Sequence, residues 1–248
     1  MELVTGGAGF IGSHLVDALV AQGKQVRVLD NFSSGREEFL AHHGEQVEVV
    51  RADLLDLDAT KAAMKGVETV HHMAANPDIR LGTEVTDTDL RQGTVATYNV
   101  LEAMRSAGVS RISFSSSSAI YGEADVMPTP ETYGPIKPIS LYGASKLASE
   151  GLISAWCGTF GAKSWIHRFA NIVGPRGTHG VIFDFIHKLK ADPTRLEVLG
   201  DGLQEKSYMS AEDCVRAMVH LVDETDEAVN LYNLGTGDTC SVRRIAEI

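Results

Sequence analysis

The segment SLYGASK, residues 140–146, places a tyrosine and a lysine four positions apart. In a helix, Tyr142 and Lys146 would project from the same side, one turn apart. Such a pair can remove the proton of a hydroxyl group, because a nearby ammonium ion favours the phenolate form of tyrosine. An exposed tyrosine beside an exposed lysine explains most such pairs, so the function depends on the elements around them.

The residues after the pair predict a helix. Apolar and small residues recur at intervals of three and four positions: Ala144, Leu147, Ala148, Gly151, Leu152 and Ala155. At about 100° per residue, Tyr142 and Lys146 fall on the side of the helix opposite this apolar stripe. The pattern therefore does not predict a core position for either residue.

Length and composition indicate a soluble, cytoplasmic protein with a substantial core in its 248 residues. The three cysteines are far apart, which predicts reduced thiols and neither a disulfide framework nor a zinc site. The net charge of −11 argues against nucleic acid binding. No window is long and apolar enough for a membrane span or a secretory leader.

Short β-rich runs alternate with helical patterns from the first residue. The runs are ELVTGG, QVRVLD, VEVVRADL, TVHHMAA, RISFSSSS and SWIHRFAN. This alternation predicts an α/β fold, a doubly wound parallel sheet of the Rossmann type. We expect residues 1–174 and 210–237 to form the nucleotide-binding domain. Residues 175–209 and 238–248 would form a small substrate lobe that is incomplete at its carboxyl end.

A glycine-rich loop, TGGAGFIGSH, follows the first run and opens an amphipathic helix. Gly7, Gly9 and Gly12 fit G-x-G-x-x-G, and Gly6, Gly9 and Gly12 fit the related G-x-x-G-x-x-G spacing. Glycine at these positions permits a tight turn and a close approach of pyrophosphate to the backbone. The amino terminus of the helix would supply N–H donors to the phosphates.

The second strand ends on an acidic residue about twenty positions after this loop. A carboxylate there, Asp30, would accept hydrogen bonds from the adenosine ribose and repel a 2′-phosphate. NAD is therefore favoured over NADP. Arg36 follows closely and is interpreted as a solvated loop residue.

With the glycine loop, Asp30-Asn31, FSSSSAIYG and YGASK in this order, the chain resembles the extended short-chain dehydrogenase/reductase family. Within it, the chain is most similar to the NAD-dependent nucleotide-sugar epimerases of the UDP-galactose 4-epimerase type. The resemblance implies that Tyr142, Lys146 and Ser117 are catalytic. Ser117 would bridge to the reacting hydroxyl, and Lys146 would also bind the nicotinamide ribose.

The resemblance also implies two sets of binding residues. Cofactor contacts would come from Gly6, Gly9, Phe10, Ile11, Gly12, Asp30, Asn31, Ser33, Asp53, Leu54, Ala74, Ala75, Ser115, Tyr142 and Lys146. Substrate contacts would come from Ser116, Ser117, Tyr142, Asn171, Val181 and Lys206. Thr178 and His179 lie in a loop that could touch substrate. The adjacent His71 and His72 point to opposite faces of a strand and are interpreted as structural, with no metal site.

Ser118 and Ala119 narrow the reaction. Family members that dehydrate or decarboxylate their substrate have acidic residues at these positions, and the reductase-epimerases have a cysteine. Serine and alanine cannot move a proton in this way. The prediction is therefore epimerisation at C4 of a UDP-sugar, through a 4-keto intermediate with tightly bound NAD. A nucleotide-sugar dehydrogenase with net redox turnover, or an NAD-sensing binding protein, are the alternatives.

Three features depart from the family pattern. Gly93 replaces an asparagine near the cofactor, and Lys206 replaces an arginine that grips the diphosphate. The sequence also ends at Ile248, where relatives continue with a further nucleotide-binding element, and we expect a missing tail. The resemblance implies a homodimer, in which the helices at about 89–107 and 142–160 form a four-helix bundle with their mates.

Overall fold

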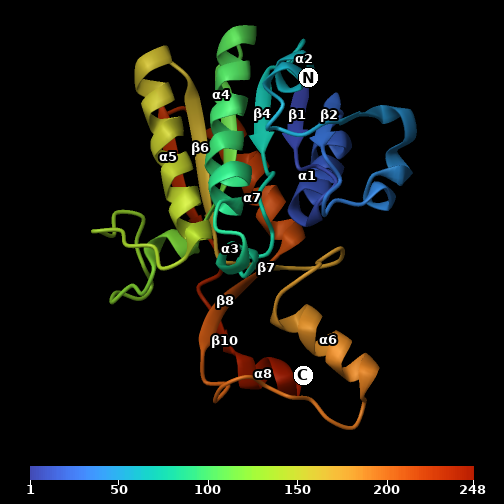
Figure 1. The fold of residues 1–248 in the computed structure, drawn as a ribbon, viewed down its shortest axis with the longest axis vertical. Coiled ribbons are helices and arrows are strands. Elements are labelled where there is room, and N and C mark those ends of the chain that lie inside the picture. The colour runs from blue at the N-terminus through green and yellow to red at the C-terminus, as the bar shows by residue number, and fades with distance from the viewer.

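The computed structural model describes residues 1–248 and contains a seven-stranded parallel sheet (Figure 1). Its strands are β1 (Glu2–Thr5), β2 (Val26–Asp30), β3 (Val47–Arg51), β4 (Thr69–His72), β5 (Arg111–Ser117), β6 (Lys163–Phe169) and β9 (Val229–Leu234). Their order is β3-β2-β1-β4-β5-β6-β9, and each neighbouring pair runs parallel. The strand order therefore reverses between β1 and β4, where nucleotides bind in folds of this class.

Helices cover both faces of this sheet and enclose two separate cores. One face is covered by α1 (Phe10–Ala21) and α7 (Ala211–Glu224), the other by α2 (Leu57–Ala63), α4 (Ala96–Ala107) and α5 (Leu141–Phe160). Leu15, Val16 and Met218 are fully buried or nearly so in the first core, and Met104 and Ile153 in the second. The predicted doubly wound α/β fold is thus confirmed.

Capping residues explain where α5 begins and where α4 and α5 end. The Ser140 hydroxyl accepts a hydrogen bond of 3.0 Å from the Gly143 N–H and caps α5. The helices α4 and α5 end at Gly108 and Gly161, both in the left-handed conformation that glycine adopts without a steric penalty.

A π-helical turn, η3 (Leu90–Val95), precedes α4 and packs against α5. A Cβ atom on Gly93 would lie only 2.6 Å from the Ser145 hydroxyl oxygen. Close packing of η3 on α5 therefore explains why glycine stands at this position, where the family resemblance led us to expect asparagine.

A smaller sheet and two helices form a second lobe, which lies below the large sheet in Figure 1. Its strands follow the order β10-β8-β7, and its elements are β7 (Asn171–Val173), α6 (Val181–Ala191), β8 (Glu205–Ser210), β10 (Thr239–Ser241) and α8 (Val242–Glu247). β7 belongs to this sheet, although the predicted boundary at residue 174 places it in the first domain. None of the helices has the length and apolar character required to cross a membrane.

The orientation of α5 differs from the orientation suggested by its apolar stripe. Ala144, Ala148, Gly151 and Ala155 are exposed, whereas the side of Lys146 faces the protein and Lys146 is 3% exposed. The inward polar groups have hydrogen-bond partners within the protein, so their burial carries no large penalty. Helical periodicity located the stripe correctly, but the stripe lies on the surface of this chain.

Candidate functional site

The loop between β1 and α1 requires its glycines. Gly6 has a φ of 67°, in the left-handed region, and its Cα lies beside the backbone of Ala74. A Cβ atom on Gly12 would lie 2.1 Å from the carbonyl oxygen of Gly6. Gly9 is the N-cap of α1, so the first N–H groups of this helix follow the loop. This geometry suits a phosphate group held by backbone donors.

Asp30 lies at the carboxyl end of β2 and is 7% exposed. Its Oδ2 accepts a hydrogen bond of 2.9 Å from the Ala8 N–H, and its Oδ1 accepts one of 2.8 Å from the Phe32 N–H. A carboxylate offers about four acceptor positions. Two therefore remain for the hydroxyl groups of a ribose, which fits a dinucleotide without a 2′-phosphate.

The predicted adenosine contacts lie together at the same edge of the sheet. The Asn31 amide donates to Asp53 Oδ2 at 3.0 Å, and the Ser33 N–H donates to Asn31 Oδ1 at 2.9 Å. The Leu54 carbonyl accepts from the Asn99 amide at 2.8 Å. Asn99 was not predicted, and its position on the inner side of α4 is the only sequence signal for it.

Lys146 is held at the carboxyl end of β5. Its Nζ donates to the Ser115 carbonyl oxygen at 2.5 Å and lies 3.4 Å from the Ser115 hydroxyl oxygen. Burial lowers the pKa of Lys146 to about 7, although the charges of Glu150 and Asp89 raise it. Near neutral pH, the lysine is therefore divided between its ammonium and amine forms.

Tyr142 lies at the start of α5, with Ser117 and Lys146 beside it. Ser117 is near enough to the phenol to lower its pKa, and Lys146 Nζ lies 5.8 Å from the centre of its ring. Burial raises the pKa of Tyr142 to about 12, and the charge of Asp89 adds to this effect. We expected the lysine to lower this pKa. In the chain without a cofactor, the pKa of Tyr142 is raised instead, because burial outweighs the effect of Ser117.

Ser116 does not lie with this group. Alternate residues of a strand point to opposite faces, and the Ser116 hydroxyl donates to Glu150 on the inner side of α5. Arg168 Nε and Nη2 donate to the same carboxylate at 3.0 and 2.7 Å. Ser116 is 1% exposed and its hydroxyl is engaged by Glu150, so its assignment to the substrate stays a prediction that this geometry does not favour. Glu150 was not predicted, although its position four residues after Lys146 places both on one helix face.

Asp89 is a second group that the sequence analysis did not identify. It is 2% exposed, its Oδ1 accepts from the Asn76 amide at 3.1 Å, and its Oδ2 has no hydrogen-bond partner. No motif marks this residue, because it reaches Tyr142 and Lys146 only through the packing of η3 and α5.

The predicted substrate residues of the second lobe lie on β7, on β8 and in the segment that leads into and begins α6. The Asn171 amide donates to the Ser207 carbonyl at 3.0 Å, Val181 begins α6, and Lys206 is exposed on β8. The Thr178 hydroxyl and His179 Nδ1 lie 3.3 Å apart in the loop between β7 and α6. The assignment of these residues to the substrate stays a prediction.

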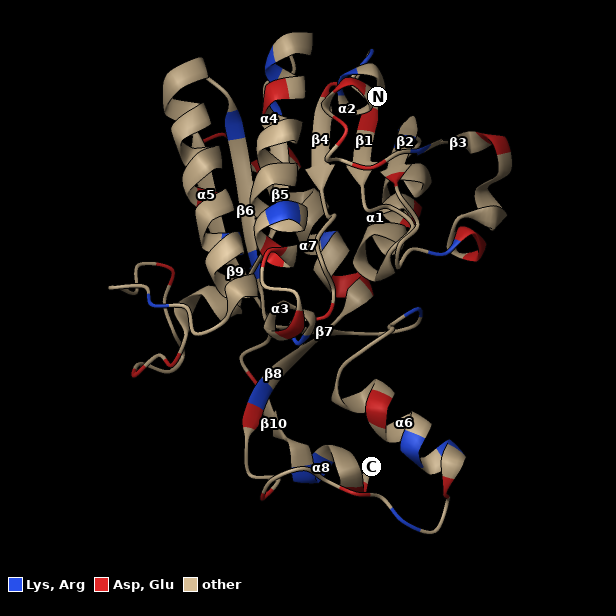
Figure 2. Ribbon diagram, viewed as in Figure 1, with Lys and Arg blue, Asp and Glu red and all other residues tan.

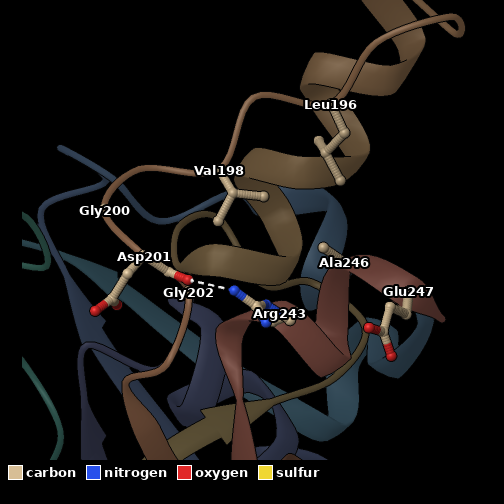
Figure 3. A pocket seen from close by; sticks show the side chains of 8 residues that line it. All are labelled: Leu196, Val198, Gly200, Asp201, Gly202, Arg243, Ala246 and Glu247. Carbon is tan, nitrogen blue, oxygen red and sulfur yellow. Dashed lines mark hydrogen bonds between the residues drawn. The ribbon is translucent and has the colours of Figure 1, made fainter.

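A cavity of about 370 Å³ lies within this lobe (Figure 3). Leu196 and Val198 line one side, and Ala246 and Arg243 of α8 line the other, with Arg243 Nη2 donating to the Asp201 carbonyl at 3.2 Å. The cavity combines three apolar residues with one cationic residue, Arg243, and two acidic residues, Asp201 and Glu247. None of the residues that line it belongs to the group of Tyr142, Lys146 and Ser117, called the Tyr142 group below.

Each of the two adjacent histidines, for which a structural role is expected, has a hydrogen-bond partner within the protein. His72 Nδ1 lies 2.7 Å from the Thr5 hydroxyl oxygen and its Nε2 lies 3.0 Å from that of Thr97, while His71 Nε2 lies 3.1 Å from Glu2 Oε2. Burial lowers the pKa of His72 to about 3, so this imidazole is neutral at physiological pH.

Comparisons with known proteins agree with this geometry. The model of the NAD dependent epimerase/dehydratase family matches residues 2–235. The UDP-glucose 4-epimerase of Mycolicibacterium smegmatis is 35% identical over 251 residues, which cover 98% of this chain and 79% of that protein. UDP-glucuronic acid decarboxylase 4 of Arabidopsis thaliana is 32% identical and is covered over 56% of its length.

Solved structures show the same relationship. A crystal structure of a UDP-galactose 4-epimerase has a TM-score of 0.90 and 44% identity, covering 99% of this chain and 80% of that one. The Thermus thermophilus UDP-glucose 4-epimerase in complex with NAD has a TM-score of 0.89 and 33% identity, with 99% and 81% covered.

Proposed function

Because the chain belongs to the NAD dependent epimerase/dehydratase family and has NAD as its cofactor, we propose that it epimerises C4 of a UDP-sugar through a 4-keto intermediate. One observation carries this proposal. Tyr142, Lys146 and Ser117 converge at the end of β5, beside positions 118 and 119 that hold no acid or base. The family also includes decarboxylases and dehydratases, which need such a group.

NAD supplies a hydride acceptor and, after reduction, a hydride donor when it is bound. The protein has to move the matching proton. Tyr142 would take the proton of the C4 hydroxyl as the C–H bond breaks, and would return it after the 4-keto sugar has turned its other face. Ser117 would hold the hydroxyl in line, since it lies beside the phenol of Tyr142 and lowers its pKa.

The same geometry sets the conditions for this proton transfer. In the chain alone, Tyr142 is a phenol at neutral pH, because its pKa is about 12. A positive charge close to the phenol lowers this pKa, and both the Lys146 ammonium and an oxidised nicotinamide ring provide one. Tyr142 would therefore become an effective base only when the cofactor is present in its oxidised form.

The substrate class rests on the relatives. Structural neighbours contain UDP-glucose and UDP-glucuronic acid, and one is a UDP-N-acetylglucosamine 4-epimerase. We propose that the lobe of residues 175–209 and 238–248 holds the nucleotide sugar. Which sugar the lobe accepts would depend on the space that the protein leaves around atoms C2, C5 and C6 of the sugar.

The exposed apolar stripe supports the expected homodimer. The only charged residues of α5, Lys146 and Glu150, are buried, so its outer side is uncharged (Figure 2). Large apolar residues continue this surface: Val95, Tyr98, Leu141 and Phe160 are 39–52% exposed. We propose that α4 and α5 pack against their mates as a four-helix bundle. Ala148→Glu should then yield a monomer in sedimentation velocity, and an unchanged sedimentation coefficient would contradict the proposal.

The activity is tested by incubating purified protein and NAD⁺ with UDP-glucose, UDP-N-acetylglucosamine, UDP-glucuronate and UDP-xylose. NMR of the anomeric protons should show the C4 epimer of at least one of them. Accumulation of free NADH would instead indicate a dehydrogenase. A protein that retains NAD and converts none of the four would contradict the proposed substrate class.

The catalytic assignment is tested by Tyr142→Phe, with Tyr133→Phe as its control. Tyr133 hydrogen-bonds to Asp125 in an outer loop and has no place in the proposed chemistry. Tyr142→Phe should retain NAD and lose turnover by a factor on the order of 100 or more. Full activity in this variant would refute the mechanism.

A further inference from the structure

Three side chains with metal-binding atoms meet on the outer side of the nucleotide-binding domain. Asp17 lies on α1, and His42 and His43 lie in the short 3₁₀ segment η2 (Ala41–Gln46). His42 Nε2 lies 2.9 Å and His43 Nε2 lies 2.7 Å from the same atom, Asp17 Oδ1. All three ligand atoms lie within 4.8 Å of one another. None of these residues belongs to the Tyr142 group.

The backbone brings the two adjacent histidines to one point. η2 contains a kink at Gly44, which has a φ of 53°. The two imidazole rings lie 3.9 Å apart at an angle of 40°, so both Nε2 atoms reach α1 from the same side. Neighbouring residues of a regular strand would point to opposite faces instead. The local fold therefore converts a His-His pair into two converging donors.

The donor set suits one class of ligand. Two imidazole nitrogens and one carboxylate oxygen are ligands that Zn²⁺ and related transition metals prefer. Bonds of about 2.0–2.2 Å in a tetrahedral arrangement place the ligand atoms roughly 3.3–3.5 Å apart. The observed separations are shorter than that, so the histidines would have to move outward by about half an ångström. His42 can do so, because half of its side chain is exposed.

Arg176 supplies the support that metal ligands usually have. Its Nη1 donates to Asp17 Oδ2 at 2.8 Å, which fixes the carboxylate and leaves Oδ1 directed at the histidines. His43 is more deeply packed than His42, with 8% of its side chain exposed. His43 is thus held in place by packing, Asp17 is oriented by Arg176, and His42 can move.

We propose that Asp17, His42 and His43 bind one divalent transition-metal ion of the zinc class, with water completing its coordination. The ion would join η2 to α1, the helix that opens at the glycine loop. Through Arg176 the same carboxylate also holds the loop between β7 and α6. The role is structural, because none of the three ligands lies among the groups that transfer a proton in the proposed reaction.

The test uses untagged, NAD-loaded protein that has been treated with a chelator and dialysed. Titration with Zn²⁺ in a calorimeter should give one site per chain, with a dissociation constant on the order of micromolar. Co²⁺ should give the intense visible absorption of a four-coordinate ion and should be displaced by Zn²⁺. His42→Ala and Asp17→Asn should each weaken binding at least ten-fold.

The matched control is His220→Ala. His220 is an exposed histidine on α7, outside the three-residue cluster, and its removal should leave the titration unchanged. Retained NAD in every variant shows that the fold is intact. The proposal is overturned if the wild type shows no saturable site, if both ligand variants titrate like the wild type, or if only one of them weakens binding. In the last case, the ion would have a different set of ligands.

Discussion

Replacing Glu150 by leucine should destabilise the protein strongly, because it leaves a buried guanidinium group without its partner. Arg168 and Glu150 have only 5% and 7% of their side chains exposed. Two nitrogens of Arg168 donate to the carboxylate, and the Ser116 hydroxyl donates to it as well. Solvent screening is therefore small, unlike at a surface ion pair.

The magnitude follows from this burial. Removing one partner of a buried ion pair costs about 3–5 kcal/mol. For a protein of this size, each kcal/mol lowers the melting temperature by about 2–4 °C, so the expected shift is roughly 6–20 °C. Replacing both residues, as Glu150→Leu with Arg168→Met, removes the unpaired charge. This double variant should recover at least half of the loss, although Tyr121 and the Glu131 carbonyl then lose the donor that Arg168 provides.

Chemical denaturation of Glu150→Leu, Arg168→Met, the double variant and the wild type measures these free energies of unfolding. If Glu150→Leu lowers the free energy of unfolding by less than about 1 kcal/mol, the reasoning is refuted, because a buried unpaired charge destabilises a protein by more than that. The variant should also lose activity near neutral pH at a temperature where it is folded. Glu150 raises the pKa of Lys146, so its removal leaves less of the ammonium form.

Other expectations follow from the glycine loop and the buried histidines. Gly12→Ala should weaken NAD binding at least ten-fold in a fluorescence titration, because the added Cβ would lie 2.1 Å from the Gly6 carbonyl oxygen. The control is Gly158→Ala in α5, where an added Cβ would have no atom within 4 Å. This variant should bind NAD normally and be more stable by up to about 1 kcal/mol. Burial lowers the pKa of His72 and of His167 to about 3. The unfolded chain therefore binds protons that the folded chain does not, and stability should fall below pH 6.5 by about 1.4 kcal/mol per pH unit for each histidine. Urea unfolding at pH 7.5 and pH 5.5 measures this difference, and equal stabilities would contradict it.

The sequence was sufficient for six strands of the large sheet, all but β9, and for the glycine loop, because both depend on local patterns. The β-rich runs correspond to β1 through β6, and the helix expected at about 89–107 ends at Ala107. The position of Asp30 also followed from its distance along the chain after the loop. In these cases one short segment carries the whole signal.

Tertiary packing decided the features that sequence could not predict. An apolar stripe on α5 does not reveal whether this chain or a second copy covers it. Ser116 and Ser117 are neighbours with the same chemistry. Because of the pleat of β5, Ser116 contacts Glu150 whereas Ser117 lies beside Tyr142. Asp89 approaches the site through an irregular turn that no motif marks.

In the proposed mechanism, the charges around Tyr142 would connect cofactor binding to catalysis. Asp89 opposes ionisation of Tyr142, and the same charge favours the ammonium form of Lys146. A site built only to ionise the tyrosine would not contain a buried carboxylate nearby. Its presence fits a site in which the phenol stays protonated until an oxidised nicotinamide adds positive charge. Asp89→Asn should therefore lower the pKa of Tyr142 and lower that of Lys146. In the pH profile of kcat the two ionisations would both move toward acid, and a profile that does not move would contradict this account.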